Sequence, residues 1–212
     1  MDFLGLSNLS ILANARDLIS ENRSINIDLR QVPLDDAKTL GALSNGDTVG
    51  VFQLEGSGMT GHIKHLQPSS MVDVASMIAL YRPGPMEHID TFIKAKHGEI
   101  AVEYLHPILQ PILEETYGVI VFQDQVFLIA QAFAGYSLGE ADVLRKAMGK
   151  KIPEIMVQEK GKFIEGALGQ GYTEELAEQV FALIEPFAGY GFPKAHAISY
   201  GLISYWTAYL KA

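Results

Sequence analysis

The sequence predicts a mainly α-helical protein built from many helices, with a few short strands and long loops. Apolar residues recur at helical spacing along most of the chain, and helix start and stop signals separate these stretches. The composition agrees with a globular protein, because 48% of the 212 residues are hydrophobic and only 19% are charged. A chain of this length has room for one sizeable core or two small ones.

The first hundred residues contain several short helical patterns and one candidate strand. The expected helices cover about 7–20, a stretch from a cap at Asp35 or Asp36 to Asn45, a stretch from Ser70 to Leu80, and 92–96. Val49 to Leu54 is expected to be a short strand.

The glycines from Gly56 to Gly61 match the G-x-G-x-x-G pattern of dinucleotide-binding folds. We reject that interpretation, because Pro68 cuts the next helix to about two turns and no clean second strand follows. A glycine-rich turn is expected there instead.

The second half of the chain has clearer helix boundaries. Tyr117 to Phe122 is expected to be a brief strand or an extended entry to a buried helix over 124–133. Further helix starts are indicated by a Ser137–Glu140 capping box, by Pro153, by Thr173 and by Pro193. Gly149 is expected to end the helix that begins after Ser137.

Positive charge gathers at the end of that helix in an otherwise acidic chain. From Arg145 to Lys162 there are six cations and two carboxylates, whereas the whole chain has a net charge of -9. Arg145 and Lys146 lie near the expected helix end, and Lys150 and Lys151 follow it. Two interpretations stay open, namely cations that stabilise a helix C-terminus and cations that bind a phosphate or another anion.

Two further places carry candidate anion-binding residues. Lys194 and His196 follow Pro193 at the start of the last helix, where free backbone N–H groups and the helix dipole favour an anion. Arg82 lies on a stiff corner before Pro83 and Pro85, where it contacts either a phosphate or nearby carbonyl groups.

Several classes of protein are disfavoured by the sequence. The chain has no cysteine, which rules out disulfides and thiolate metal sites. The segment from Ala197 to Leu210 is shorter than the ~20 apolar residues that span a bilayer, and no secretory signal pattern follows Met1. The net charge of -9 argues against indiscriminate binding to nucleic acid. We therefore expect a cytoplasmic protein without a membrane partner.

Six stretches together resemble one family. They are Asp2-Phe-Leu-Gly-Leu, Gly50-Val-Phe-Gln-Leu-Glu55, Arg82-Pro-Gly-Pro85, Tyr117-Gly-Val-Ile-Val-Phe-Gln123, Leu144-Arg-Lys-Ala-Met-Gly-Lys-Lys151 and Phe187-Ala-Gly-Tyr-Gly-Phe-Pro-Lys-Ala-His196. In this order they resemble the alpha subunits of bacterial DNA polymerase III, which are C-family replicative polymerases. Since those subunits are far longer, the resemblance implies a fragment, with the end of the palm at 1–6 and a multi-helix fingers-type domain at 7–212. The fingers region is expected to have two helical subregions, about 7–116 and 117–212.

The resemblance also implies roles for individual residues. Asp2 matches one of three catalytic carboxylates that hold two Mg²⁺ ions, and the other two have no counterpart here. Arg145, Lys146, Lys194 and His196 match residues near the incoming dNTP, and Arg82 is assigned to the same pocket. Lys150 and Lys151 are assigned to DNA contacts.

Because a two-metal site needs several carboxylates, we expect the isolated chain to be inactive. The implied partners are dNTP and primer-template DNA, and other replicase subunits such as the sliding clamp would bind through parts absent from this sequence. Two alternatives remain: a non-catalytic helical module that binds nucleic acid or protein, and a helical scaffold whose cations serve as caps.

Overall fold

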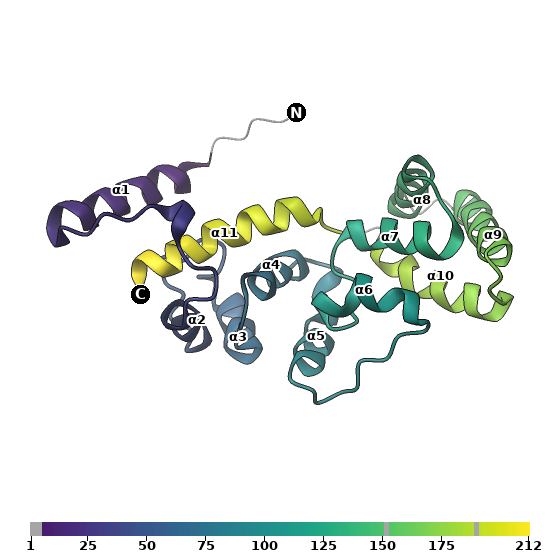
Figure 1. Cartoon of the computed structure of the whole chain (residues 1–212), viewed down its shortest axis with the longest axis horizontal. Coiled ribbons are helices and arrows are strands. Elements are labelled where there is room, and N and C mark those ends of the chain that lie inside the picture. The colour runs from purple at the N-terminus through teal and green to yellow at the C-terminus, as the bar shows by residue number, and fades with distance from the viewer. Residues whose placement is uncertain (1–5, 151–152, 189–190) are drawn as a thin grey trace. The chain divides into compact units, whose positions relative to one another are not determined.

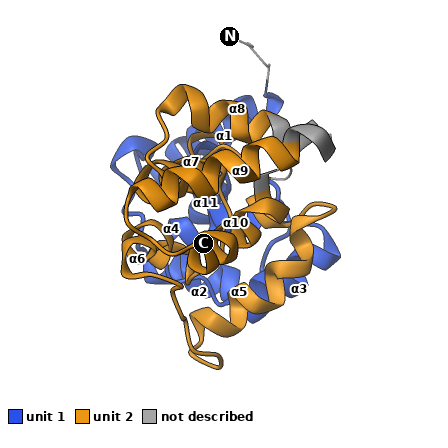
Figure 2. Ribbon diagram, turned by 90° about the vertical axis from the view of Figure 1, so that its right-hand side faces the viewer, with its two compact units in different colours: residues 1–78, 198–212 blue, residues 79–197 orange. Residues whose placement is uncertain are grey.

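The computed structural model describes residues 6–150, 153–188 and 191–212, and these residues are mainly helical (Figure 1). The chain forms two compact units, coloured separately in Figure 2. Unit 1 comprises 1–78 and 198–212, and unit 2 comprises 79–197. The expected end of the palm at 1–6 and fingers region at 7–212 are domains of the polymerase family. They differ in kind from these two compact units, so that division stays a prediction.

Unit 1 contains the N-terminal helices and most of the last helix. Its elements are α1 (Ser7–Arg23), the 3-10 turn η1 (Leu29–Gln31), α2 (Ala37–Ser44), α3 (Ser57–Leu66), most of α4 (Met71–Leu80) and most of α11 (Lys194–Lys211). The Tyr205 side chain of α11 is fully buried in this unit. Its hydroxyl donates to the Pro33 carbonyl over 2.9 Å and accepts the Asp36 N–H over 2.8 Å. One aromatic side chain thereby fixes the loop that leads into α2.

Unit 2 contains the remaining helices, of which four form its main core. Its elements are η2 (Pro85–His88), α5 (Ile89–Lys96), η3 (Pro107–Leu109), α6 (Gln110–Leu113), η4 (Glu114–Thr116), α7 (Gln123–Ala134), α8 (Leu138–Lys150), α9 (Pro153–Gly169) and α10 (Glu174–Ala188). Helix α7 packs against α8, α9 and α10. The Phe133 ring of α7 stacks on Tyr172 with a centroid distance of 4.1 Å, and Phe163 of α9 is fully buried beside it. Each fully buried side chain of this size contributes about 1.5–3 kcal/mol.

The expected strand from Val49 to Leu54 is wrong. The segment instead makes two tight turns, in which the Val51 N–H donates to Thr48 and the Leu54 N–H donates to Val51. Gln53 has a left-handed φ of 62°, which an extended strand does not allow. Val51 and Leu54 are both fully buried, so turns with a spacing of three residues satisfy the apolar pattern as well as a strand would.

Two expectations based on glycines are also wrong. The predicted glycine-rich turn over 56–61 is the start of helix α3, because Gly56 takes the extended N-cap position and the following glycines adopt helical geometry. Helix α8 runs through Gly149 as far as Lys150, the last described residue before 153. A glycine permits a helix to end but does not force it to do so.

The other helix starts agree with their sequence signals. Asp36 caps α2 by accepting the Thr39 N–H over 2.8 Å, and Thr173 accepts the Leu176 N–H over 3.3 Å. The stretch before α7 is extended, and its one β-bridge among the described residues pairs Phe122 with Phe192. The expected short strands are therefore reduced to this bridge, and the fold is mainly α-helical as predicted. Among the described residues, none of the helices combines the length and apolar character that crossing a membrane requires.

The contact between α7 and α9 predicts the effect of a single methyl group. A Cβ atom added at Gly166 of α9 would lie 2.2 Å from the Ala134 carbonyl oxygen of α7. The substitution Gly166→Ala is therefore expected to lower the free energy of unfolding by about 1–3 kcal/mol, measured by urea denaturation.

Gly161 of the same helix provides the matched control, because a Cβ added there meets nothing within 4 Å. Gly161→Ala is expected to raise the free energy of unfolding by up to about 1 kcal/mol, since alanine is the better helix former. Equal effects of the two substitutions would contradict the close approach of α7 and α9.

Candidate functional site

The first group of candidate residues lies on α8. Asp142 holds both predicted cations: its Oδ1 accepts Arg145 Nε at 3.1 Å and Nη2 at 2.9 Å, and its Oδ2 lies 2.6 Å from Lys146 Nζ. The side chain of Lys146 is 60% exposed and that of Arg145 31%. The hydrogen bonds from Lys146 and then Arg145 lower the pKa of Asp142. These three side chains therefore form a solvent-accessible group with a net charge of +1.

The start of α8 is fixed by the predicted capping box and by a bond to α9. The Ser137 N–H donates to Glu140 Oε2 over 2.9 Å, and the Glu140 N–H donates to Ser137 Oγ over 3.3 Å. Glu140 Oε1 also accepts Lys162 Nζ of α9 over 2.9 Å. The hydrogen bonds from Lys162 and then Ser137 lower the pKa of Glu140 to about 2. Glu140 therefore couples the helix that carries Arg145 to its neighbour.

The second group surrounds Phe192 in unit 2. The guanidinium carbon of Arg82 lies 4.3 Å from the centroid of the Phe192 ring, and the His196 ring meets the same ring at 5.0 Å with an edge-on geometry. Arg82 Nε donates to the Ala79 carbonyl over 3.2 Å, so the predicted contact with a carbonyl is present. Burial lowers the pKa of Arg82. The aromatic ring thus holds an arginine and a histidine from distant parts of the sequence together.

Lys194 follows Phe192 by two residues and is held by two carboxylates. Its backbone N–H donates to Asp124 Oδ2 over 2.7 Å, and its ammonium forms an ion pair with Glu115. The N-terminus of α11 was predicted to bind an anion, and the Asp124 carboxylate takes that place. Negative charge at a helix N-terminus is stabilising, which explains the position of Asp124.

The loop before α11 approaches α7 closely. The Gln123 N–H donates to the Phe192 carbonyl over 3.1 Å. A Cβ added at Gly191 would lie 2.9 Å from Gln123 Cα, so only glycine fits there without a shift. This approach places Phe192, and with it Lys194 and His196, against the start of α7.

The remaining predicted site residues lie at or beyond the edge of the described residues. Lys150 is the last residue of α8, and both Lys151 and Asp2 lie outside the described residues. Across 6–150, 153–188 and 191–212 there is no group of three or more His, Asp or Glu side chains that could hold a metal ion. A two-metal centre around Asp2 therefore stays a prediction.

Three residues of the site were missed at the sequence level. Asp142 was detectable, because it precedes Arg145 and Lys146 by three and four residues, the spacing of ion pairs on one helix face. Glu115 and Asp124 are 79 and 70 residues away from Lys194, and no local pattern indicates such pairs.

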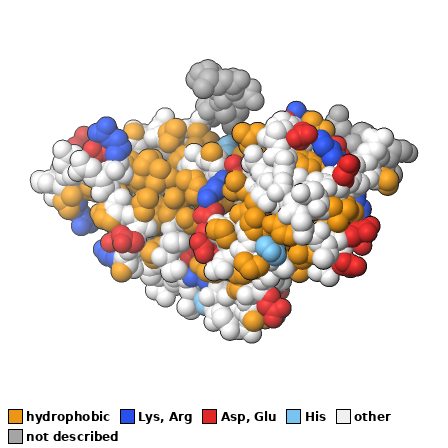
Figure 3. All heavy atoms as spheres, turned by 45° about the vertical axis from the view of Figure 1, so that its right-hand side comes forward, with side chains coloured by type: hydrophobic (Ala, Val, Ile, Leu, Met, Phe, Trp, Pro, Cys, Tyr) orange, Lys and Arg blue, Asp and Glu red, His pale blue; other side chains and the backbone are white. Residues whose placement is uncertain are grey.

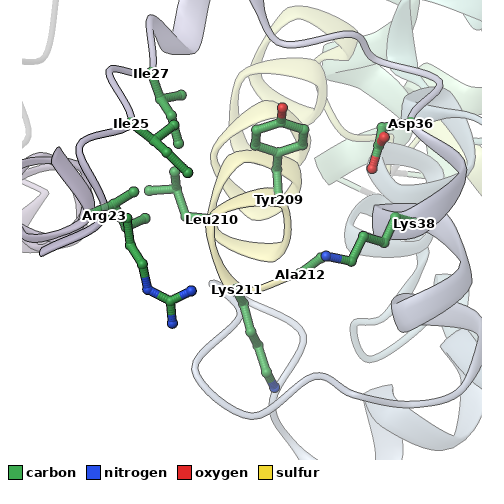
Figure 4. Close-up of a pocket in the computed structure, with 10 residues that line it drawn as sticks. Arg23, Ile25, Ile27, Asp36, Lys38, Tyr209, Leu210, Lys211 and Ala212 are labelled. Atoms are coloured by element: carbon green, nitrogen blue, oxygen red, sulfur yellow. The ribbon is translucent and has the colours of Figure 1, made fainter.

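Several charged side chains outside the two groups also form ion pairs. Figure 3 shows blue and red side chains next to one another on the face that it displays. In unit 1, a hollow of about 450 Å³ beside the end of α11 has Arg23, Lys38 and Lys211 among its lining residues (Figure 4). Lys211 Nζ donates to the carbonyls of Asp47 and Val49 over 3.2 and 2.8 Å. A cation in the last turn of a helix offsets the negative partial charge there, so Lys211 has a structural role at the end of α11.

The low pKa of Glu140 predicts an effect of pH on stability. A carboxyl group with a lowered pKa in the folded state stabilises that state above its ordinary pKa of 4.5, and this contribution is lost as the pH falls to about 2. The free energy of unfolding of Glu140→Gln should be lower than that of the native chain above pH 5, with the difference vanishing near pH 2.

Glu165→Gln is the matched control, because Glu165 lines the same hollow of about 230 Å³ as Glu140 and Lys162. This control should lower the free energy of unfolding by less than Glu140→Gln does, because it leaves the capping box and the Glu140–Lys162 bond intact. A difference for Glu140→Gln that stays constant down to pH 2 would contradict the role of its ionised carboxylate.

Comparisons with known proteins agree with the resemblance of the six motifs. The family model of the bacterial DNA polymerase III alpha subunit finger domain matches residues 8–171. The DNA polymerase III subunit alpha of Staphylococcus epidermidis is 51% identical over 211 residues, which are 100% of this chain and 20% of the relative. The proteins of the same name from Aquifex aeolicus and Thermus aquaticus are 50% and 49% identical, and all of this chain covers 18% of each. The chain thus spans about a fifth of the length of the curated relatives it matches.

Proposed function

The chain belongs to the bacterial DNA polymerase III alpha subunit family, and we propose that it is the fingers region of a replicative polymerase that binds the triphosphate of the incoming dNTP. The observation that supports this role is the grouping of Arg82 and His196 around Phe192, with Lys194 two residues further along the chain, together with the cations Arg145 and Lys146 on α8. Both groups lie in unit 2. We also propose the cytoplasm as its compartment.

The electrostatics support an exchange of partners on binding. Arg145 and Lys146 share one carboxylate, and the Lys194 ammonium pairs with another. Exposed ion pairs of this kind contribute only about 0–1 kcal/mol, whereas charge-assisted bonds to phosphate contribute about 1.5–3 kcal/mol each. A triphosphate therefore displaces the carboxylates from these cations without a large loss.

The residues differ in the bonds that they offer. Arg145 presents a planar fork that can donate two parallel hydrogen bonds to one phosphate, whereas Lys146 offers a point charge.

Lys150 and Lys151 are proposed to contact the backbone of the primer-template DNA. Asp2 is proposed as a ligand of the two Mg²⁺ ions in the intact enzyme, whose other carboxylates are outside this sequence. Contacts with other replicase subunits, such as the sliding clamp, would also involve other parts of the polymerase.

Removal of the Arg145 side chain should make the polymerase bind or incorporate dNTP less well. In the intact polymerase that carries this segment, Arg145→Ala is expected to raise the apparent KM for dNTP, or to lower incorporation, by about ten- to a hundredfold. Steady-state incorporation at varied dNTP concentration measures the effect.

Arg16→Ala is the matched control, because Arg16 donates through the same two nitrogen atoms to Asp17 on helix α1. This variant should retain the native KM and incorporation rate. Unchanged nucleotide kinetics in a folded Arg145→Ala enzyme would refute the assignment.

The isolated chain should not polymerise DNA. In-line phosphoryl transfer in a two-metal site needs carboxylates that clamp both ions, and the resemblance assigns only Asp2 of this sequence to that site. A primer-extension assay with the purified chain, Mg²⁺ and dNTP should give no product above a mock purification. Templated incorporation above that background would contradict the expectation.

A second candidate function is a non-catalytic helical module that binds a protein or nucleic acid. Its specific support is α1, where Leu9, Ile11 and Leu18 are 48–58% exposed. Titration of the chain with dNTP and with primer-template DNA at two salt concentrations separates the candidates. Salt-dependent binding of dNTP favours the fingers role, whereas the absence of any interaction with either ligand favours protein contacts or a scaffold.

A further inference from the structure

We propose that Gln125 is a positioning residue that fixes the start of α11, and thereby Lys194 and His196, for contact with the triphosphate. This inference rests on the proposed function of that group. Gln125 lies in the first turn of α7 and was not among the residues singled out by the sequence. It is polar, yet its side chain is 2% exposed.

All the hydrogen-bonding groups of the Gln125 amide have partners. Its Oε1 accepts the N–H groups of Val121 and Phe122 at 2.8 and 2.9 Å. Its Nε2 donates to the Ile112 carbonyl at 3.1 Å and to Thr116 Oγ1 at 2.7 Å. A buried amide with two accepted and two donated bonds joins three segments at fixed distances.

The bonds that Gln125 accepts hold a segment that pairs with Phe192. They hold the extended residues Val121 and Phe122, and Phe122 pairs with Phe192 in the β-bridge. The next residue, Gln123, donates its N–H to the Phe192 carbonyl. Since Phe192 precedes α11 by two residues and contacts the His196 ring, the position of this helix start depends on the stretch that Gln125 holds.

The bonds that Gln125 donates hold a second segment that contacts Lys194. Thr116 follows Glu115, whose carboxylate forms the ion pair with the Lys194 ammonium. Asp124, the neighbour of Gln125 in sequence, accepts the Lys194 N–H. Gln125 therefore connects the segments that hold the backbone and the side chain of Lys194. Arg145 and Lys146 are held by Asp142 on α8 and do not depend on these bonds.

Gln125→Glu tests this arrangement with little change in shape. The carboxylate still accepts the bonds from Val121 and Phe122, but it cannot donate to Ile112 and Thr116. Gln131→Glu is the matched control, since it adds the same charge on α7. Thr116→Val is a milder second variant that removes one of the four bonds, for use where Gln125→Glu fails to fold.

The experiment combines a binding titration with hydrogen exchange on the whole chain. The dissociation constant for dATP is measured for the native chain, for Lys194→Ala and Arg145→Ala, and for both substitutions in the Gln125→Glu background. Amide exchange at Gln123 and Lys194 is measured without dATP. Gln125→Glu is expected to weaken binding roughly tenfold and to speed exchange at both amides.

Non-additivity separates positioning from general loss of stability. In the Gln125→Glu background, Lys194→Ala should raise the dissociation constant for dATP by less than about threefold, because the contact of Lys194 with the triphosphate is already lost. Arg145→Ala should raise the dissociation constant by the same factor in both backgrounds. The inference would be overturned if Gln125→Glu reduced the contributions of Lys194 and Arg145 to dATP affinity equally. It would also be overturned if the amides of Gln123 and Lys194 exchanged at the same rate in Gln125→Glu as in the native chain. If the native chain does not bind dATP, the proposed function fails, and with it the role toward the triphosphate. The exchange data then show separately whether Gln125 fixes the loop.

Discussion

The burial of helix α7 is the constraint on which the geometry of unit 2 depends. Its apolar side chains, including Val126, Ile129 and Phe133, are fully buried against the neighbouring helices. Each contributes about 1.5–3 kcal/mol, which exceeds the value of a typical exposed ion pair. Burial therefore sets the rotation of α7 about its axis. That rotation in turn decides where the polar side chains of its first turn, Asp124 and Gln125, point.

The same difference in energy agrees with the proposed binding of a triphosphate by an acidic protein. The cations of α8 and α11 are held in place by single carboxylates, so they are oriented before a ligand arrives. Orientation before binding reduces the conformational entropy that binding would otherwise cost. Because exposed ion pairs are weak, the cations remain exchangeable. Under the proposed function, the carboxylates thus orient the cations and can still be displaced by a triphosphate.

Sequence reasoning succeeded where the deciding interactions are local. The capping box of Ser137 and Glu140 spans three residues, and the cap at Asp36 spans the same distance, so both could be predicted. The segment from Val49 to Leu54 was assigned wrongly, because tight turns and a strand can bury the same apolar residues. The partners of Lys194 were missed, since they depend on which segments the tertiary fold brings together.

The length of α8 also bears on the two interpretations of its cations. The helix dipole favours cations only within the last turn. Since α8 extends at least to Lys150, Arg145 and Lys146 lie one turn or more before its end. The dipole therefore accounts poorly for these two residues, and their position is explained by Asp142, which lies one turn earlier on the same face. A cation pair that is held by a neighbouring carboxylate and is not needed to stabilise the helix end is available for a phosphate ligand.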